Sequence, residues 1–244
     1  MTLTILGCWG GFPRPGGATS GYLISHGLYH VLIDCGSGVV SRLSQHIEIK
    51  RLNAVFLSHY HYDHFCDVGV LQYARMVHSQ IGERMGCLPI YAPACDRGCF
   101  SSLAMPPYTQ GIAYQNGGSV RVGPLTVTFF RSSHPLECYA MRIQVDNKTI
   151  FYTADTAYSE HLVQAARGCD LLIAESSLYP GHDGTEVGHM TSEQAAKMAH
   201  CAGAKELILS HLPAYGHVQF LLQGISDQYD GPVALATEGL IRKL

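Results

Sequence analysis

The sequence is poor in charge. Charged residues make up 14% of the 244-residue chain, whereas about a quarter is usual for globular domains. The net charge of −3 and the lack of any run of Lys or Arg leave no basic field for a nucleic-acid backbone. No apolar run reaches the roughly 18 residues that a membrane helix needs, so no membrane partner is expected. The first residues lack the basic and long apolar stretches of a signal peptide, which predicts a cytoplasmic protein.

The sequence also lacks a cysteine framework. Its nine cysteines, an odd number, are scattered mostly within apolar segments, so free buried thiols are expected rather than disulfides. Cys95 and Cys99 have the spacing of half a zinc site, but no second pair with such spacing accompanies them. A structural zinc site built from cysteines is therefore not expected.

The chain does have a series of short apolar segments within a composition that is 47% apolar. These segments predict strands mixed with helices, and therefore an α/β fold in a single domain spanning residues 1–244. Several expected strands end at a His, Asp or Glu, and loops at strand ends are where α/β proteins gather functional side chains. Residues 93–118 are rich in Pro and Gly and are expected to be irregular. Strands are expected at 3–6, 22–25, 30–34, 53–58, 149–155, 170–176 and 206–211, and helices at 65–78 and 191–203.

One stretch concentrates side chains that bind metals. The segment SHYHYDH at residues 58–64 places three histidines and an aspartate within six positions, directly after an expected buried strand. Imidazole nitrogen and carboxylate oxygen suit zinc, and also manganese or iron. His59 and His61 point the same way if the loop is extended, and Asp63 and His64 follow on the next turn. The segment therefore predicts one loop that supplies ligands to two neighbouring metal ions.

SHYHYDH resembles the HxHxDH signature of the metallo-β-lactamase superfamily, and the resemblance continues in order over nearly the whole chain. Three later strand ends match the remaining ligands of that family, namely His134 after LTVTFFRSS, Asp155 in IFYTAD and His211 in ILSHLPAY. The resemblance implies a four-layer αββα sandwich with the site at one edge. It also implies two divalent metal ions, expected to be zinc or alternatively manganese, and a hydroxide shared between them.

The resemblance assigns ligands residue by residue. Asp63 is expected to be both a ligand and a catalytic residue. Asp34, in LIDCGSG, matches a supporting acid of the family, although an aspartate before a glycine-rich turn is equally consistent with turn formation. The glycines of the loop at residues 7–21 are expected to bring backbone N–H groups to the site. The expected ligands are His59, His61 and His134 for one ion, Asp63, His64 and His211 for the other, and Asp155 between them.

Two further stretches resemble one branch of the superfamily. GHMT at residues 188–191 resembles the GHST-type motif of the ribonuclease Z branch, and AESS at 174–177 resembles its acidic motif. In that branch the histidine and the acid act together on the leaving oxygen of a phosphodiester, which implies catalytic roles for His189 and Glu175. Expelling an alkoxide requires a proton, and a histidine steadied by a glutamate can deliver one near neutral pH.

The chain departs from ribonuclease Z in one respect. The members that process tRNA carry a long Gly/Pro-rich arm between the ligand that matches His134 and the aspartate that matches Asp155. Here these residues are 21 positions apart, and two ordinary strands fill the interval. Since the arm and a basic patch are both missing, tRNA is not an expected partner. The expected function is hydrolysis of a small or cyclic phosphodiester by a dinuclear metal-dependent phosphodiesterase.

The sequence leaves three alternatives open. Thioesters and lactones are cleaved in this superfamily by the same hydroxide, and a metal can stabilise their oxyanion without His189. Ribonuclease Z-type processing of tRNA 3′ ends is the second alternative, and a non-catalytic regulator that binds metal or nucleotide is the third. The family also often forms homodimers. Residues 93–118 are a candidate cover for the site, where Tyr108 and Tyr114 either stack on a base or, as we expect, pack on the surface.

Overall fold

The chain folds as two compact units in the computed structural model, which describes all of residues 1–244. Each unit contains one large mixed sheet with helices, as expected for the predicted α/β class. The assignment of the whole chain to a single domain stays a prediction. The N-terminal unit consists of Met1–Gln115, Val122–Pro124 and Thr237–Lys243, and the C-terminal unit of Asn116–Arg121, Leu125–Ala236 and Leu244.

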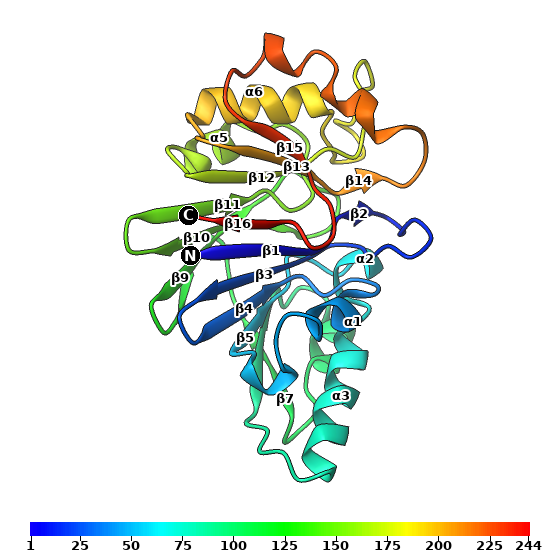
Figure 1. The fold of residues 1–244 in the computed structure, drawn as a ribbon, viewed down its shortest axis with the longest axis vertical. Coiled ribbons are helices and arrows are strands. Elements are labelled where there is room, and N and C mark those ends of the chain that lie inside the picture. The colour runs from blue at the N-terminus through cyan, green and yellow to red at the C-terminus, as the bar shows by residue number, and fades with distance from the viewer. The chain divides into compact units, whose positions relative to one another are not determined.

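The sheet of the N-terminal unit has seven strands (Figure 1). In spatial order they are β16 (Ile241–Lys243), β1 (Thr2–Gly7), β3 (Gly21–His26), β4 (Tyr29–Ile33), β5 (Ala54–Phe56), β6 (Leu88–Ala92) and β7 (Thr109–Ala113). Neighbours are antiparallel from β16 to β4 and parallel from β4 to β7. The carboxyl ends of β4 and β5 therefore meet at one edge of this sheet. The two-residue strand β2 (Trp9–Gly10) lies in the loop after β1.

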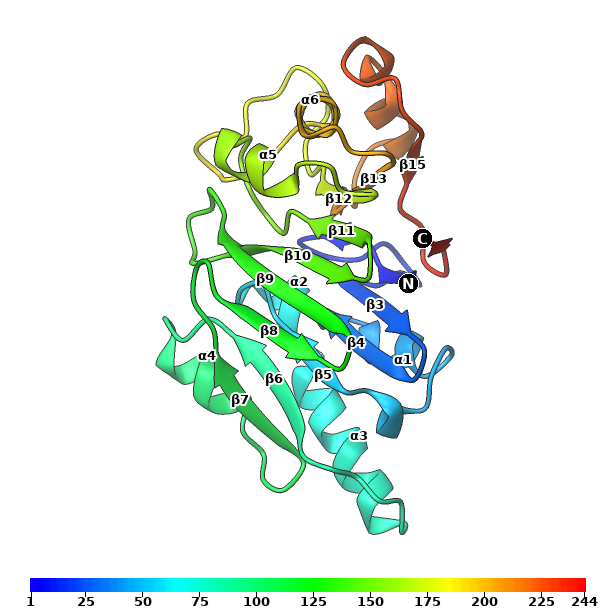
Figure 2. The same ribbon diagram turned by 90° about the vertical axis from the view of Figure 1, so that its left-hand side faces the viewer.

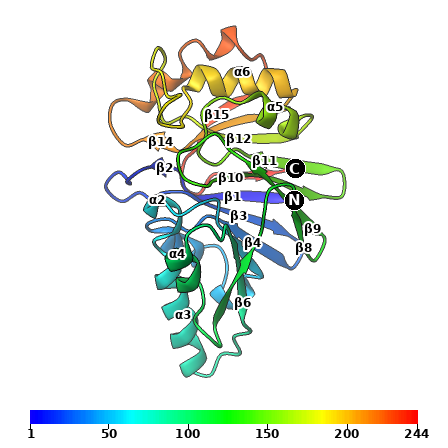
Figure 3. The same ribbon diagram turned by 180° about the vertical axis from the view of Figure 1, so that it is seen from behind.

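Helices cover one face of this sheet, as Figures 1 and 3 show for α1 (Val39–Leu43) and α3 (Val68–Gln80). The short α2 (Tyr62–Phe65) precedes α3, and the 3-10 turn η1 (Ile49–Arg51) precedes β5. The helix predicted at 65–78 is thus confirmed, with its start divided between α2 and α3. The shared core contains Leu23, Leu32, Val55 and Ile90 from the strands and Val39, Leu43, Val68 and Leu71 from the helices.

The C-terminal unit is built on a second seven-stranded sheet, of which Figure 2 shows β8 to β11 side by side. In spatial order its strands are β15 (Val233–Leu235), β13 (Leu207–Ser210), β12 (Leu171–Glu175), β11 (Lys148–Tyr152), β10 (Tyr139–Val145), β9 (Leu125–Arg131) and β8 (Ser119–Val122). Neighbours are parallel from β15 to β11 and antiparallel from β11 to β9. The carboxyl ends of β11, β12 and β13 therefore share one edge. The short strand β14 (Leu212–Pro213) follows β13.

Two helices of the C-terminal unit pack against each other, α5 (Glu160–Ala166) and α6 (Ser192–Ala202), and α6 also packs on β12 and β13. The capping box predicted at Thr191 is confirmed: Thr191 Oγ1 accepts from Gln194 N at 3.2 Å, and Gln194 Oε1 accepts from Thr191 N at 3.0 Å. The predicted stop is confirmed as well, because Gly203 ends α6 with φ of 63°. Two 3-10 turns follow β14, η2 (Val218–Leu222) and η3 (Ile225–Asp227).

Three strand ends have a strained backbone. Asp34 after β4, Ala154 after β11 and His211 after β13 adopt φ of 56°, 50° and 51°, in the left-handed region that favours glycine. Such a conformation costs on the order of 1–3 kcal/mol and persists where the surrounding structure enforces it, often at functional sites. The strain therefore marks the same strand ends that carry the predicted site residues.

The prediction of an irregular segment at residues 93–118 is wrong. The segment contains α4 (Arg97–Ser102), whose N-cap Asp96 accepts from Cys99 N at 2.8 Å, and β7, which pairs in parallel with β6. The expectation that Tyr114 packs on the surface is also wrong. Its ring is buried, and its hydroxyl donates to Leu57 O at 2.6 Å. Strand pairing of β7 and helix capping at Asp96 therefore give the segment a regular structure that its Pro and Gly content does not predict.

The cysteines are all free, as predicted, but only four of the nine are buried: Cys8, Cys35, Cys138 and Cys169. Burial raises the pKa of Cys169 to about 12, so this thiol stays protonated at neutral pH. No helix in the chain combines the length and the apolar character that crossing a membrane requires.

Candidate metal centre

In the N-terminal unit, the ends of β4 and β5 bring Asp34 next to the SHYHYDH segment. Because the two strands are parallel neighbours, Asp34 follows one and Ser58 follows the other at the same edge. The carboxylate of Asp34 accepts hydrogen bonds from Ser58 N at 2.7 Å, Ser58 Oγ at 2.9 Å and His64 Nδ1 at 2.8 Å. All three residues are fully buried. Asp34 thus orients His64, which is the supporting role that the resemblance implied.

These hydrogen bonds assign the protons of two imidazoles in the same cluster. His64 donates from Nδ1 to Asp34, so its Nε2 carries a lone pair. Ser58 Oγ gives its single proton to Asp34 and accepts from His59 Nδ1 at 3.0 Å, which leaves a lone pair on His59 Nε2. That atom lies 3.0 Å from His61 Nδ1. The cluster therefore presents imidazole lone pairs of the kind that bind a metal ion.

Asp63 is held by the glycine-rich loop. Its Oδ2 accepts from Gly11 N at 2.7 Å, as expected for a loop that brings backbone N–H groups to the site. The same oxygen lies 3.4 Å from His64 Nε2. The loop is anchored in turn by Glu238, whose Oε1 accepts from Trp9 Nε1 at 3.1 Å. A residue near the end of the chain thus helps to place a predicted ligand.

In the C-terminal unit, three parallel strands deliver three predicted site residues to one edge. Asp155 follows β11, Glu175 ends β12 and His211 follows β13. His211 Nε2 lies 3.3 Å from Asp155 Oδ1, and both residues are almost completely buried. These two predicted ligands are therefore adjacent, although they are 56 positions apart in the sequence.

Glu175 and His189 form the pair that the ribonuclease Z resemblance implied. His189 Nδ1 donates to Glu175 Oε1 at 2.8 Å, and the same oxygen accepts from Thr156 N at 3.1 Å. The side chain of Glu175 is 1% exposed, whereas that of His189 is 22% exposed. The hydrogen bond leaves His189 Nε2 on the side away from the carboxylate.

His134 contacts the GHMT segment in the same unit. Its Nδ1 donates to Gly188 O at 3.2 Å, and its ring lies 5.4 Å from that of His189. Gly188 has φ of 75°, and a Cβ at this position would come within 2.8 Å of His134 Nδ1. A glycine is therefore required here for two reasons, its backbone conformation and the close approach of an imidazole.

The spacing of ligand atoms in both clusters fits divalent metal ions. Two atoms bound to a tetrahedral zinc ion at about 2.0–2.2 Å lie roughly 3.3–3.6 Å apart. The observed separations are 3.4 Å for His64 and Asp63, and 3.3 Å for His211 and Asp155. Side-chain atoms of Asp155, His189 and His211 that are able to bind a metal ion all lie within 4.8 Å of one another. His64 also fits the usual pattern of zinc ligands, in which the second ring nitrogen donates to a carboxylate.

The sequence did not single out the serine hydroxyls. Ser58 contacts Asp34 and His59, and Ser177 contacts Glu175 and His211. Ser58 lies in the SHYHYDH motif and Ser177 in the AESS motif. Serine is common at strand ends, however, and no spacing rule predicts such a contact. The structure also assigns a role to Gly188, which the sequence showed only as part of GHMT.

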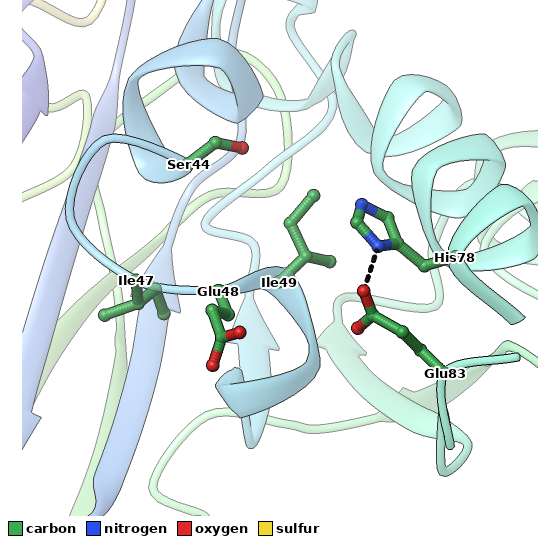
Figure 4. A pocket seen from close by; sticks show the side chains of 6 residues that line it. All are labelled: Ser44, Ile47, Glu48, Ile49, His78 and Glu83. Atoms are coloured by element: carbon green, nitrogen blue, oxygen red, sulfur yellow. Dashed lines mark hydrogen bonds and ion pairs between the residues drawn. The ribbon is translucent and has the colours of Figure 1, made fainter. Parts of the chain in front are cut away.

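A pocket elsewhere in the N-terminal unit contains none of the predicted site residues (Figure 4). It measures about 170 Å³ and lies between the end of α1 and the end of α3. His78 Nδ1 donates to Glu83 Oε1 at 2.9 Å there, and this hydrogen bond holds the pKa of Glu83 below its ordinary value. Lys50 lies 3.5 Å from the same carboxylate, so the acid is already neutralised within the protein.

Comparison with known proteins identifies relatives over nearly the full length of the chain. A beta-lactamase superfamily domain matches residues 29–212. The chain is 43% identical over 241 residues to a probable metallo-hydrolase, YhfI, of Bacillus subtilis, and 99% of each protein is covered. It is 25% identical over 260 residues to ribonuclease Z of Sulfolobus acidocaldarius, covering 86% of this chain and 87% of that protein.

Solved structures share the fold. The crystal structure of YhfI from Bacillus subtilis, a metallo-beta-lactamase fold protein, matches with a TM-score of 0.97 at 42% identity, covering 99% of this chain and 98% of that one. A diphosphatase from the PhnP family matches with a TM-score of 0.78 at 17% identity, covering 100% and 97%. The fold predicted from the sequence is therefore confirmed.

Proposed function

Because this chain is a metal-dependent hydrolase of the metallo-β-lactamase superfamily, in its ribonuclease Z-like branch, we propose that it hydrolyses a small or cyclic phosphodiester. The Glu175–His189 pair, with its hydrogen bond of 2.8 Å, is the observation that carries this proposal. A buried carboxylate that fixes a partly exposed imidazole is suited to giving a proton to a departing alkoxide. The loss of an alkoxide from phosphorus needs such a proton.

Two divalent ions, zinc or manganese, are proposed to bind the side chains expected from the sequence. The separations of 3.3 and 3.4 Å within the ligand pairs and the proton positions of the imidazoles support this assignment. When bound, such ions would stabilise negative charge on the phosphate and lower the pKa of water toward neutrality. Asp63 retains its proposed catalytic role as well as its role as a ligand. The ligands are His59, His61, Asp63, His64, His134, Asp155 and His211.

His189 is proposed to move the proton. In its protonated form, His189 donates a hydrogen bond from Nδ1 to Glu175 and gives the proton on Nε2 to the leaving oxygen. Glu175 fixes the ring and stabilises the positive charge of the imidazolium before transfer. The exposed part of the His189 side chain then allows the ring to regain a proton from solvent.

The segment between His134 and Asp155 favours a small substrate over tRNA. It consists of β10, a tight turn at Asp146 and β11, which pair directly with each other. No insertion extends from this hairpin, so the chain has no arm there to hold a folded RNA. We therefore propose a small or cyclic phosphodiester as the substrate and not a tRNA precursor.

Turnover of bis(p-nitrophenyl) phosphate by the zinc- or manganese-loaded protein tests the proposal. We expect diester cleavage to exceed cleavage of the p-nitrophenyl monoester and of a thioester. Substituting His189→Ala should lower kcat for the diester by about 10²–10⁴-fold, the usual contribution of a general acid. His182→Ala is a matched control, since His182 is an exposed histidine and lies, like His189, in the loop before α6.

Three results would contradict the proposed function. Thioester or lactone cleavage without diester cleavage would favour a carbonyl substrate, for which a metal can stabilise the oxyanion. Equal diester turnover by the wild type and by His189→Ala would remove the proton donor from the mechanism. Cleavage of a tRNA precursor at rates above those of small diesters would restore the ribonuclease alternative.

A further inference from the structure

Ser177 lies at the centre of the hydrogen bonds of the C-terminal unit. Its hydroxyl oxygen lies 2.8 Å from Glu175 Oε2, 2.7 Å from His211 Nδ1 and 3.3 Å from His189 Nδ1. Its backbone N also donates to Glu175 Oε2, at 3.1 Å. The hydroxyl thus touches both members of the proposed proton-donating pair and one proposed metal ligand.

Counting protons fixes the direction of these hydrogen bonds. A hydroxyl has one proton and two lone pairs, whereas a carboxylate only accepts. If the hydroxyl proton pointed to His211, a lone pair of Ser177 would face a lone pair of Glu175 across 2.8 Å, which is repulsive. The proton therefore lies between Ser177 and Glu175, and the short contact to His211 requires a proton on His211 Nδ1.

This proton assignment decides which nitrogen of His211 is available. With Nδ1 protonated, a neutral imidazole keeps its lone pair on Nε2. That atom lies 3.3 Å from Asp155 Oδ1, at the separation of two ligands on one ion. The opposite tautomer would present an N–H to the metal and could not bind it.

We infer that Ser177 is a positioning residue that holds His211 in its metal-binding tautomer and ties it to Glu175. The Ser177 hydroxyl thus connects the proposed ligand His211 with Glu175. The same carboxylate accepts the hydrogen bond of the proposed proton donor His189. The effect on turnover rests on the proposed function, whereas the effects on the tautomer and on metal affinity do not.

Three variants test the role of the hydroxyl. Ser177→Ala removes it, and Ser177→Thr keeps a hydroxyl at the same carbon. Ser176→Ala is the matched control, because Ser176 is the buried neighbour in the same motif and its hydroxyl bonds only to Ser210 O, at 3.2 Å.

The first measurement is the tautomer of His211, read from long-range ¹H–¹⁵N correlations of the imidazole in chelator-treated protein. We expect a proton on Nδ1 in the wild type, in Ser177→Thr and in Ser176→Ala, and a mixture of tautomers in Ser177→Ala. A wild-type spectrum with the proton on Nε2 would overturn the inference, even if Ser177→Ala failed to fold.

The second measurement is zinc affinity by competition with a chromophoric chelator. Loss of a group that orients a ligand typically weakens metal binding about 10–100-fold, and we expect this for Ser177→Ala with recovery in Ser177→Thr. Affinity of Ser177→Ala within twofold of the wild type would also overturn the inference. If these results hold while the wild type cleaves no diester, the inference stands and only the proposed substrate fails.

Discussion

The two units hold their imidazoles with the same set of hydrogen bonds. In each, a serine hydroxyl donates to a buried carboxylate and lies against the Nδ1 of one histidine, while the carboxylate accepts from the Nδ1 of a second histidine. The members are Ser58, Asp34, His59 and His64 in the N-terminal unit, and Ser177, Glu175, His211 and His189 in the C-terminal unit.

The units differ in the exposure of the second histidine. His64 is fully buried together with Asp34, whereas the side chain of His189 is 22% exposed beside a buried Glu175. A sealed imidazole cannot exchange protons with water readily, but it can hold a metal in one orientation. A partly exposed imidazole can exchange protons with water, which suits a proton donor. By our proposal, the same arrangement thus serves ligand placement in one unit and both ligand placement and proton transfer in the other.

The largest effect is expected from Asp34→Ala. It leaves Ser58 N, Ser58 Oγ and His64 Nδ1 without their buried acceptor, and a buried donor left unsatisfied typically costs about 1–3 kcal/mol for each group. We expect that decrease in the free energy of unfolding, measured with urea, together with loss of bound metal and of turnover.

Asp146→Ala is the control for Asp34→Ala. Asp146 also has a positive φ, 52°, but it is exposed in the turn between β10 and β11. Its substitution carries the same backbone strain, about 1 kcal/mol, at an exposed position. Equal losses for the two variants would mean that strain, and not the hydrogen bonds of Asp34, accounts for the effect.

The second prediction concerns the partly exposed arrangement. In Glu175→Gln, the amide keeps one acceptor oxygen, so it can serve His189 or Ser177 but not both. We expect kcat for a phosphodiester to fall about 10²-fold or more, with a smaller loss of stability than in Asp34→Ala and with metal still bound at saturating zinc. Glu186→Gln, an exposed acid in the same loop, should behave like the wild type. A loss of metal as complete as in Asp34→Ala would show that the two carboxylates do not differ in role.

The comparison also explains what the sequence could reveal. In the N-terminal unit, four proposed ligands fall within six residues, so the SHYHYDH motif was visible without a structure. In the C-terminal unit, Asp155 and His211 come from separate strands and were found through the resemblance to a family. Their adjacency depends on the parallel order of β11, β12 and β13, which no local pattern contains.

Other features could not be predicted because they depend on contacts between distant residues. Ser177 meets His211 across 34 positions, and Gly188 meets His134 across 54. β7 was missed for the same reason. It is a strand because it pairs with β6, and its own sequence has no clear strand pattern. Strands with clear apolar patterns and the capping box of α6 were predictable because their signals are local.

A third, smaller effect is expected from Glu238→Ala, which tests whether Glu238 holds the glycine-rich loop of the N-terminal unit in place. Glu238 Oε1 accepts from Trp9 Nε1 and from Ala18 N at 3.0 Å, on either side of the loop whose Gly11 N holds Asp63. Loss of these hydrogen bonds should cost about 1–2 kcal/mol of stability and weaken zinc binding a few-fold. Glu48→Ala, at an exposed ion pair with Lys50, is the control. Unchanged zinc affinity in a destabilised Glu238→Ala would limit the loop to a structural role.

The smallest effect concerns the opposite ends of the parallel strands, where the units again correspond. Asn53 precedes β5 and its Oδ1 accepts from His30 N of β4 at 2.7 Å, while Asp170 precedes β12 and its Oδ2 accepts from Thr149 N of β11 at 2.9 Å. The amide carries no charge, so only the second of these contacts should depend on pH. Burial opposes ionisation of Asp170, but hydrogen bonds from Lys205 and Thr149 outweigh it and hold its pKa below the ordinary value.

The sign of the pH effect follows from that lowered pKa. As pH falls, the unfolded chain takes up the proton of Asp170 first, so the stabilisation is complete above its unfolded pKa of 3.8 and is lost as pH falls through the folded pKa. We expect Asp170→Asn to be less stable than the wild type by about 0.5–1 kcal/mol at pH 7 and pH 5, because Lys205 is largely exposed, and to approach it below pH 4. Thermal unfolding of both proteins across this range measures the difference. For Asn53→Ala the difference from the wild type should stay constant over the same range, and a difference for Asp170→Asn that is equally constant would show that its charge contributes nothing to the contact between β11 and β12.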